Sequence, residues 1–193
     1  MRVVEPGERR RTDTDGVAES ADLTDVNVDG VAVEQCDGQV RYDAGARGEH
    51  HPVGEGVLAE QPFEQLSRRP VELSGLVLTR SCRPVVGALV DLWQADDRGE
   101  YDNKGFRLRG HVFTDAEGRY AFRTIMPGLY PGRTRHYHVK VQAPARPVLT
   151  TQLYFPDEPL NRSDDFFHPE LVMQVAKGED ALRARFDVVL ALR

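Results

Sequence analysis

Residues 71–95 read VELSGLVLTRSCRPVVGALVDLWQA, and their composition indicates the fold class. Two runs rich in Val and Leu, at 71–78 and 87–95, flank a short segment that holds Pro84, and Gly87 opens the second run. Apolar runs rich in Val favour β-strands, and Pro and Gly favour the turns between strands. The stretch therefore predicts two β-strands joined by a turn.

The same pattern continues towards the C-terminus. Five further runs are rich in Val, Leu, Phe, Tyr or Thr, and most of them alternate apolar with polar residues: RGHVFTD (109–115), GRYAFRTI (118–125), RHYHVKVQA (135–143), LTTQLYF (149–155) and RFDVVLAL (185–192). Segments rich in Gly, Pro and Asp separate them, and no helical period of 10–15 residues intervenes, which disfavours a parallel α/β sheet. We predict an all-β protein, an antiparallel β-sandwich with long loops, and one helical stretch at 168–174.

The first 70 residues carry weaker signals. Residues 1 to about 35 mix Asp, Glu, Thr, Gly and Arg without periodicity, which predicts a flexible N-terminal leader. A brief helix is expected at 63–67. We therefore expect two parts, a leader and poorly defined segment at 1–70 and a sandwich domain at 71–193.

Composition excludes several partners. The 193 residues include 25 Lys and Arg against 31 Asp and Glu, for a formal charge of −6, and neither a basic block nor a long apolar run occurs. Nucleic acid and membrane partners are therefore not expected. The N-terminus lacks the apolar region of a secretory signal, so a cytoplasmic location is expected. Cys36 and Cys82 are too few for a disulfide framework, and two unpaired thiols are the expectation.

His136 and His138 form a His-x-His pair within one predicted strand. Alternate residues of a strand share a face, so the two imidazoles are expected to point the same way, as a metal site would need. No Asp or Glu occurs between Glu117 and Asp157, so a nearby carboxylate ligand is not offered. Tyrosines in the loops are the available anionic donors, and two phenolates would favour Fe(III) over zinc.

Several motifs together resemble those of the intradiol ring-cleavage dioxygenases, the family of catechol and protocatechuate 3,4-dioxygenases. They are a tyrosine after WQADDRGE, the run RGHVFTDAEGRYAFRTIMPGLY, an arginine three residues before HYH, and TQLYF. The resemblance covers about 120 residues, from about Val71 onwards, and implies a mononuclear non-haem Fe(III). The ligands that it implies are Tyr101, Tyr130, His136 and His138.

The resemblance also implies a reaction and further site residues. A catechol would bind the iron, and O2 would open the ring between the two hydroxylated carbons to give a cis,cis-muconate-type product. Tyr130 would leave the iron and take up a substrate proton, Arg133 would stabilise the developing negative charge, and Gln152 would line the pocket. By contrast, Arg135 is expected to be a solvated strand residue, Trp93 a core residue, and His111, like His50, His51 and His168, a structural or pocket-lining side chain.

The sequence departs from the family pattern before the core. A Thr-Glu-Gly-Pro-Tyr-like segment, which supplies pocket residues in the family, is not found, so the identity of the catechol stays open. No amphipathic period in 1–70 matches the helical dimerisation region of catechol 1,2-dioxygenases, and a homo-oligomer would need another interface.

Two other functions remain as alternatives. The strand and turn pattern also resembles transthyretin-like and carboxypeptidase-regulatory-like modules, which are not catalytic and do not require the two tyrosines and two histidines together. A zinc or copper hydrolase using His136 and His138 is disfavoured, because no nearby carboxylate could act as general base.

Overall fold

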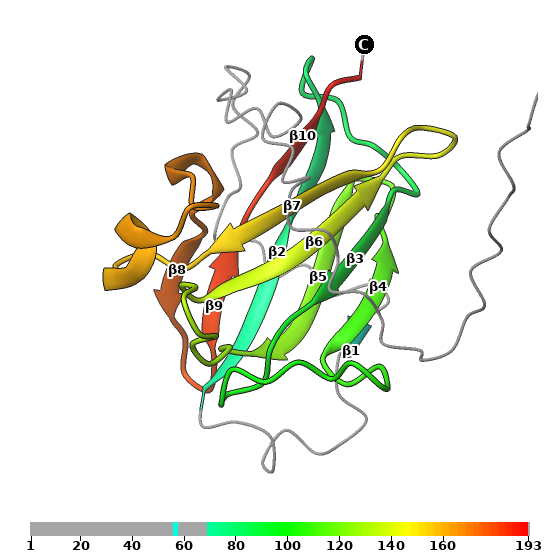
Figure 1. The fold of residues 1–193 in the computed structure, drawn as a ribbon. Helices are drawn as coiled ribbons and strands as arrows, with labels where there is room; N and C mark the ends of the chain where they lie inside the picture. The colour runs from blue at the N-terminus through cyan, green and yellow to red at the C-terminus, as the bar shows by residue number, and fades with distance from the viewer. Residues whose placement is uncertain (1–55, 58–68, 193) are drawn as a thin grey trace, which may run out of the picture.

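Two β-sheets pack face to face in the computed structural model, which describes residues 56–57 and 69–192 (Figure 1). The strands in chain order are β1 (Gly56–Val57), β2 (Pro70–Thr79), β3 (Leu89–Trp93), β4 (Arg109–Phe113), β5 (Arg119–Ile125), β6 (His136–Gln142), β7 (Leu149–Tyr154), β8 (Gln174–Lys177), β9 (Leu182–Arg185) and β10 (Val188–Leu190). Two short 3₁₀ helices, η2 (Pro159–Ser163) and η3 (Pro169–Leu171), follow β7. The predicted β-sandwich is confirmed.

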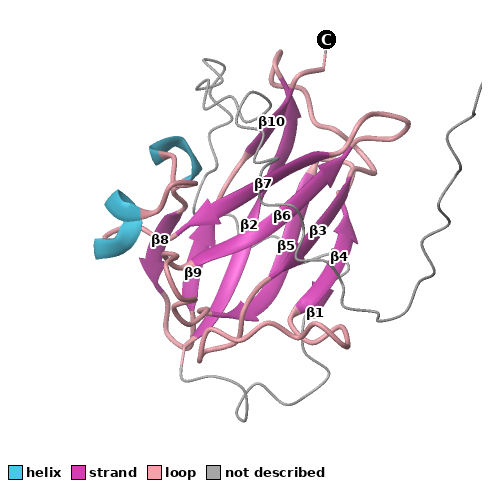
Figure 2. Ribbon diagram, in the orientation of Figure 1, coloured by secondary structure: helices cyan, strands magenta, loops and turns pink. Residues whose placement is uncertain are grey.

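The two sheets differ in strand direction. One has the order β4-β3-β6-β7 and is antiparallel at every pair, as expected. The other has the order β1-β5-β2-β9-β8, with β10 also on β2, and its pairs β1–β5, β2–β9 and β2–β10 are parallel. The pairs of β9 and β10 with β2 are parallel because the C-terminal segment runs alongside the long strand β2, an arrangement that strand patterns alone do not reveal (Figure 2). β1 precedes the expected domain boundary at residue 71 and still pairs with β5.

Alternation along the strands determines which side chains enter the core. On β6, Tyr137, Val139 and Val141 are buried in the main hydrophobic cluster, so the residues between them face the opposite side of the sheet. On β3, Val90 and Leu92 enter the same cluster and are fully buried. Each such side chain contributes about 1.5–3 kcal/mol by leaving water, which fixes the register of the two strands.

Trp93 is a correction to the sequence analysis. It was expected in the core, but the alternation on β3 places it on the outer face with Leu89 and Asp91, where it is only partly buried. There it lines a cavity, as described below.

The helix predicted at 168–174 is much shorter in the structure. At 168–174 the chain forms only the three-residue η3, and β8 begins at Gln174. A longer helix is prevented because Met173 donates a backbone hydrogen bond to the carbonyl of Tyr154 at 2.9 Å, which ties the segment to β7. The helix expected at 63–67 and the leader at 1 to 35 lie outside the described residues.

Cys82 is a second correction. It was expected to be a free thiol, but it is disulfide-bonded. The chain's other cysteine, Cys36, lies outside the described residues. Disulfides persist mainly in oxidising compartments and are rare in the cytoplasm. The bond at Cys82 therefore does not support the predicted cytoplasmic location, which stays a prediction.

Among the described residues, no helix is long and apolar enough to cross a membrane.

Candidate metal centre

The outer face of the four-stranded sheet carries the candidate site. Strand register places Arg109 of β4, Trp93 of β3, His138 of β6 and Gln152 of β7 in one row across the sheet. His136 lies two residues before His138 on the same face, as the sequence predicted. The site thus lies over one face of the sheet, at the end where the loops 94–108 and 126–135 meet.

Two glycines bring these loops into backbone contact. Gly99 has φ +86°, and a Cβ placed there would lie 2.1 Å from the carbonyl oxygen of Leu129. Gly128 donates its N–H to the carbonyl of Asp96 at 2.6 Å. A side chain at Gly99 would force the two backbones apart, so the loops can approach only because the residue has none.

Asp96 organises the first of these loops. Its carboxylate accepts backbone hydrogen bonds from Arg98 and Glu100 at 2.9 and 3.0 Å and pairs with Arg107 at 3.1 Å. A carboxylate that caps its own loop in this way fixes the turn. The turn delivers Tyr101 towards His136 and His138.

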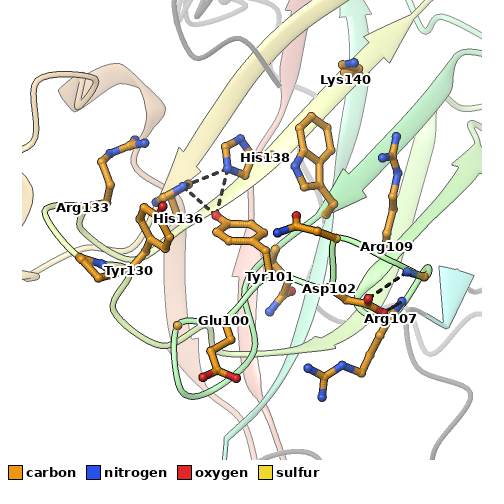
Figure 3. Close-up of a pocket in the computed structure, with 16 residues that line it drawn as sticks. Glu100, Tyr101, Asp102, Arg107, Arg109, Tyr130, Arg133, His136, His138 and Lys140 are labelled. Carbon is orange, nitrogen blue, oxygen red and sulfur yellow. Dashed lines mark hydrogen bonds between the residues drawn. The ribbon is translucent and has the colours of Figure 1, made fainter. Parts of the chain in front are cut away.

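Three donor atoms converge where the loop meets the strand. The hydroxyl of Tyr101 lies 3.0 Å from Nε2 of His138 and 3.3 Å from Nε2 of His136, and the two Nε2 atoms are 3.2 Å apart (Figure 3). Nδ1 of His136 lies 2.7 Å from the carbonyl of Thr134, so it carries the proton and leaves Nε2 as an acceptor. The chain therefore directs two imidazole nitrogens and one phenol oxygen at a common point.

Tyr130 lies beside this group, in the second loop. Its ring meets the ring of Tyr101 edge-on, with centroids 5.6 Å apart, and 44% of the residue is exposed. It lines the same cavity as the other three residues. The structure thus brings all four expected ligands together, with Tyr130 the most exposed of them.

Burial sets the protonation of the donors. It lowers the pKa of His136 to about 4 and that of His138 well below its usual value, which keeps both imidazoles neutral near pH 7. Burial also raises the pKa of Tyr101 to about 12, a shift that the nearby Arg133 opposes. The imidazoles are ready to bind a metal, whereas the phenol must release its proton to do so.

The donor set fits a metal ion. Donor atoms 3.0–3.3 Å apart match neighbouring corners of a coordination polyhedron with bonds of about 2.1 Å. In the described part of the chain, His, Cys, Asp and Glu side chains alone form no group of three that could hold a metal, so the tyrosines are essential to this site. Such a mixed nitrogen and phenolate set suits a trivalent ion.

Arg133 lies next to the donors and is held rigidly. Its Nε donates to Asp164 at 2.9 Å, its second guanidinium nitrogen donates to Gln152 at 2.6 Å, and the guanidinium packs on the ring of Phe166. The side chain is nearly buried but lines the cavity. Gln152, expected to line the pocket, instead lies behind Arg133, where it also accepts a hydrogen bond from Tyr154.

Arg135 is not the solvated residue that the sequence suggested. Its side chain is only 26% exposed, pairs with Glu158 at 3.1 Å and donates to the carbonyl of Pro127. It therefore fastens the loop that carries Tyr130 to the segment after β7. His111 is exposed on β4 and packs on Phe113, so it takes no part in the site.

These groups open into a cavity of about 560 Å³. Its walls include the four expected ligands, Arg133, Trp93, Arg107, Arg109 and Lys140, and Figure 3 shows Tyr130 and Arg133 on one side of His138 and Arg109 and Lys140 on the other. A cavity of this size accommodates a small organic molecule.

Known proteins place the chain in a family. The sequence model of the family described as Dioxygenase matches residues 53–191, most of the chain and all of the site. The chain belongs to the intradiol ring-cleavage dioxygenases. This result confirms the resemblance on which the ligand prediction rested.

Relatives of this dioxygenase-family chain include both curated proteins and solved structures. Hydroxyquinol 1,2-dioxygenase of Rhizobium sp. (strain MTP-10005) is 35% identical over 160 residues, 69% of this chain and 52% of the relative. Protocatechuate 3,4-dioxygenase beta chain of Burkholderia cepacia is 35% identical over 156 residues, 66% of each. The chain thus spans between about half and two thirds of the length of these relatives.

Among solved structures, the dioxygenase domain of a dioxygenase carbohydrate-binding protein fusion from Streptomyces sp. SirexAA-E is 51% identical. The match has a TM-score of 0.68 and covers 71% of this chain and 87% of that one. 3-Chlorocatechol 1,2-dioxygenase from Rhodococcus opacus 1CP is 26% identical, with a TM-score of 0.62 and coverage of 69% and 63%. The β-sandwich is therefore that of the intradiol family.

Three residues of this intradiol-family site were not found from the sequence. Asp164 lies in the pair Asp164–Asp165, and nothing local distinguishes the two. Lys140 follows the histidines at the same spacing of two, a signal that could have placed it on their face. Trp93 lies two residues after Asp91 and therefore on the same face of β3. The polar residue at position 91 indicates that this face lies outside the core.

Proposed function

We propose that the chain is a non-haem Fe(III)-dependent dioxygenase that cleaves a catecholic ring with O2 between the two hydroxylated carbons. The observation that carries the proposal is the convergence of Tyr101, His136 and His138 within 3.0–3.3 Å of one another, beside Arg133 and within a cavity. In this assignment Tyr101, Tyr130, His136 and His138 hold the iron.

When bound, the ion would act as a Lewis acid that favours the deprotonated catechol and activates its ring towards O2. The side chains of the protein supply the donor atoms and fix their orientation. His136 and His138 contribute neutral donors fixed by strand β6, and the hydrogen bond from His136 to Thr134 holds its ring in one orientation. The ligand directions are therefore set by the sheet before a metal or substrate arrives.

Arg133 would stabilise the negative charge that develops on the ring during attack. Its guanidinium is always charged, and Asp164 and Gln152 fix its direction, so little reorganisation is needed. Removal of one such preorganised group costs about 10²- to 10³-fold in turnover in other enzymes. Gln152 would act by positioning Arg133.

Tyr130 would hold the substrate proton. Its greater exposure distinguishes it from Tyr101, whose ring is packed against His138. A half-exposed ring on a Pro-Gly loop has room to turn away from the donor group and accept the proton of a catechol hydroxyl. In the overall reaction, the bond between the two hydroxylated carbons breaks and each carbon gains one atom of O2, which gives a cis,cis-muconate-type diacid.

The visible absorption spectrum and the iron content of the purified protein test this proposal. A phenolate-to-Fe(III) band that shifts when catechol is added without oxygen, followed by a diacid product on admission of O2, would support it. His138→Gln should abolish the band, and His111→Gln, a change to an exposed histidine of β4, should keep it. A protein that stays colourless after Fe(III) reconstitution would leave a non-catalytic member of the family as the better interpretation.

A further inference from the structure

The cavity has a second, cationic end. Lys140 follows His138 by two residues on the same face of β6, and Arg109 lies across from Trp93 on β4. Both line the cavity, as does Arg107. Figure 3 shows Lys140 and Arg133 on opposite sides of His138, so positive charge flanks the donor group on two sides.

Most of these positive charges already have partners. Arg107 pairs with Asp96 at 3.1 Å, Arg109 pairs with Asp91 at 3.0 Å, and Arg133 pairs with Asp164 at 2.9 Å. Lys140 is the exception, because within the described part of the chain it forms no ion pair. Its ammonium group lies 5.4 Å from the centre of the Trp93 ring instead.

The carboxylates at the cavity rim do not neutralise Lys140. The carboxylate of Asp102 accepts backbone hydrogen bonds from Lys104, Gly105 and Arg107, so it faces its own loop. Figure 3 shows the exposed Glu100 directed away from His136 and His138. Asp91 lies opposite Lys140 on β3, but its carboxylate is engaged by Arg109.

Trp93 forms an aromatic surface that His138, Arg109 and Lys140 all approach. Its indole stacks on His138, with centroids 4.8 Å apart and planes 7° apart, and the guanidinium of Arg109 lies 5.3 Å from its centre. Because β3 lies between β4 and β6, Arg109 approaches from the side opposite His138. Lys140, two residues beyond His138 on the same face of β6, lies against the same indole, so Trp93 is next to both the donor group and the ammonium group.

We propose that Lys140 binds a carboxylate carried on a side chain of the catechol, so that the preferred substrates are catechols with an acidic arm that lies along Trp93. This inference rests on the proposed ring-cleaving function and names its substrate class. An unpaired ammonium group in a partly buried cavity forms a charge-assisted hydrogen bond with a carboxylate. Such a bond corresponds to about a tenfold preference over an uncharged analogue.

The test compares dihydrocaffeate with its amide, dihydrocaffeamide, which has the same length and no charge. Kd is measured by anaerobic titration of the iron-loaded protein, and kcat/KM is measured with O2. The native chain should favour the acid about tenfold in both quantities, and the preference should fall as salt is added. Lys140→Met should bring the ratio of acid to amide close to one. Lys177→Met, the same charge change on the exposed β8, should keep the native ratio.

Each outcome is informative. Cleavage of both compounds with no preference for the acid, or a preference that Lys140→Met leaves intact, would overturn the inference and leave the ring-cleaving function standing. If catechol and both compounds are neither bound nor cleaved, the proposed function fails and the inference fails with it. The salt dependence is measured on the native chain, so the test does not depend on the folding of a variant.

Discussion

The guanidinium of Arg133 and the carboxylate of Asp164 form a buried ion pair of 2.9 Å beside the metal donors. The same carboxylate oxygen accepts the backbone N–H of Thr134 at 2.9 Å, so one residue orients both the arginine and the start of the histidine strand. An arginine held at such a position presents its charge in a fixed direction, which is what stabilisation of a developing charge requires.

Asp164→Asn should therefore impair turnover more than substrate binding. The amide keeps the shape but removes the counterion, and an unbalanced buried charge costs about 3–5 kcal/mol of folding free energy. We expect kcat to fall about 10²-fold with a smaller change in KM. Steady-state kinetics and thermal melting measure the two effects.

A double variant separates positioning from a merely structural role. If Asp164 acts through Arg133, Arg133→Met combined with Asp164→Asn should lose no more turnover than Arg133→Met alone. Fully additive losses would contradict this. Asp165→Asn, a change to the exposed neighbour, is the matched control and should resemble the native chain.

Gly99→Ala should separate the two loops of the site. At φ +86° the new Cβ would lie 2.1 Å from the carbonyl oxygen of Leu129, so the backbone that carries Tyr130 must move away from Tyr101. Iron content per chain should fall by more than half, and stability should fall by about 1–3 kcal/mol. Atomic absorption and thermal melting provide the measurements.

Gly132→Ala is the control for this change. Gly132 also has positive φ, at +77°, but a Cβ there meets no atom within 4 Å. It should carry the backbone penalty of about 1–2 kcal/mol and keep its iron. Equal iron losses in the two variants would show that close approach of the loops is not what Gly99 provides.

The sequence predicted the parts of the site that depend on local periodicity. His136 and His138 share a face because strands have a period of two, and the tyrosines were found in the loops and through the resemblance of their motifs to those of the family. Asp164 was missed because its role depends on contacts with Arg133 and Thr134, and both β6 and β7 lie between these residues and Asp164 in the chain. Parallel pairing of β9 and β10 with β2 was missed for the same reason, since pairing partners are chosen in space.

Trp93→Leu should weaken metal binding without removing a ligand. The indole covers one face of His138 and, with Arg109 on its far side, restricts the imidazole to one plane. Loss of a group that orients a metal ligand typically lowers affinity about 10- to 100-fold. Competition with a chelator measures the loss. Phe113→Leu, a change to an exposed aromatic residue of β4, should show native iron retention.

Tyr101→Phe should mainly lower iron affinity, whereas Tyr130→Phe should mainly lower turnover. The hydroxyl of Tyr101 lies within 3.3 Å of both imidazoles and its ring is packed against His138, so its removal takes away a fixed anionic donor. Tyr101→Phe should lower iron affinity more than about 100-fold, beyond the effect of an orienting residue. Tyr130→Phe, which changes an exposed ring, should retain most of its iron and lose about 10²-fold in turnover, because the proton acceptor is gone. Iron analysis and oxygen-uptake rates distinguish the two losses, and equal iron loss in both variants would show that Tyr130 is as firmly bound as Tyr101.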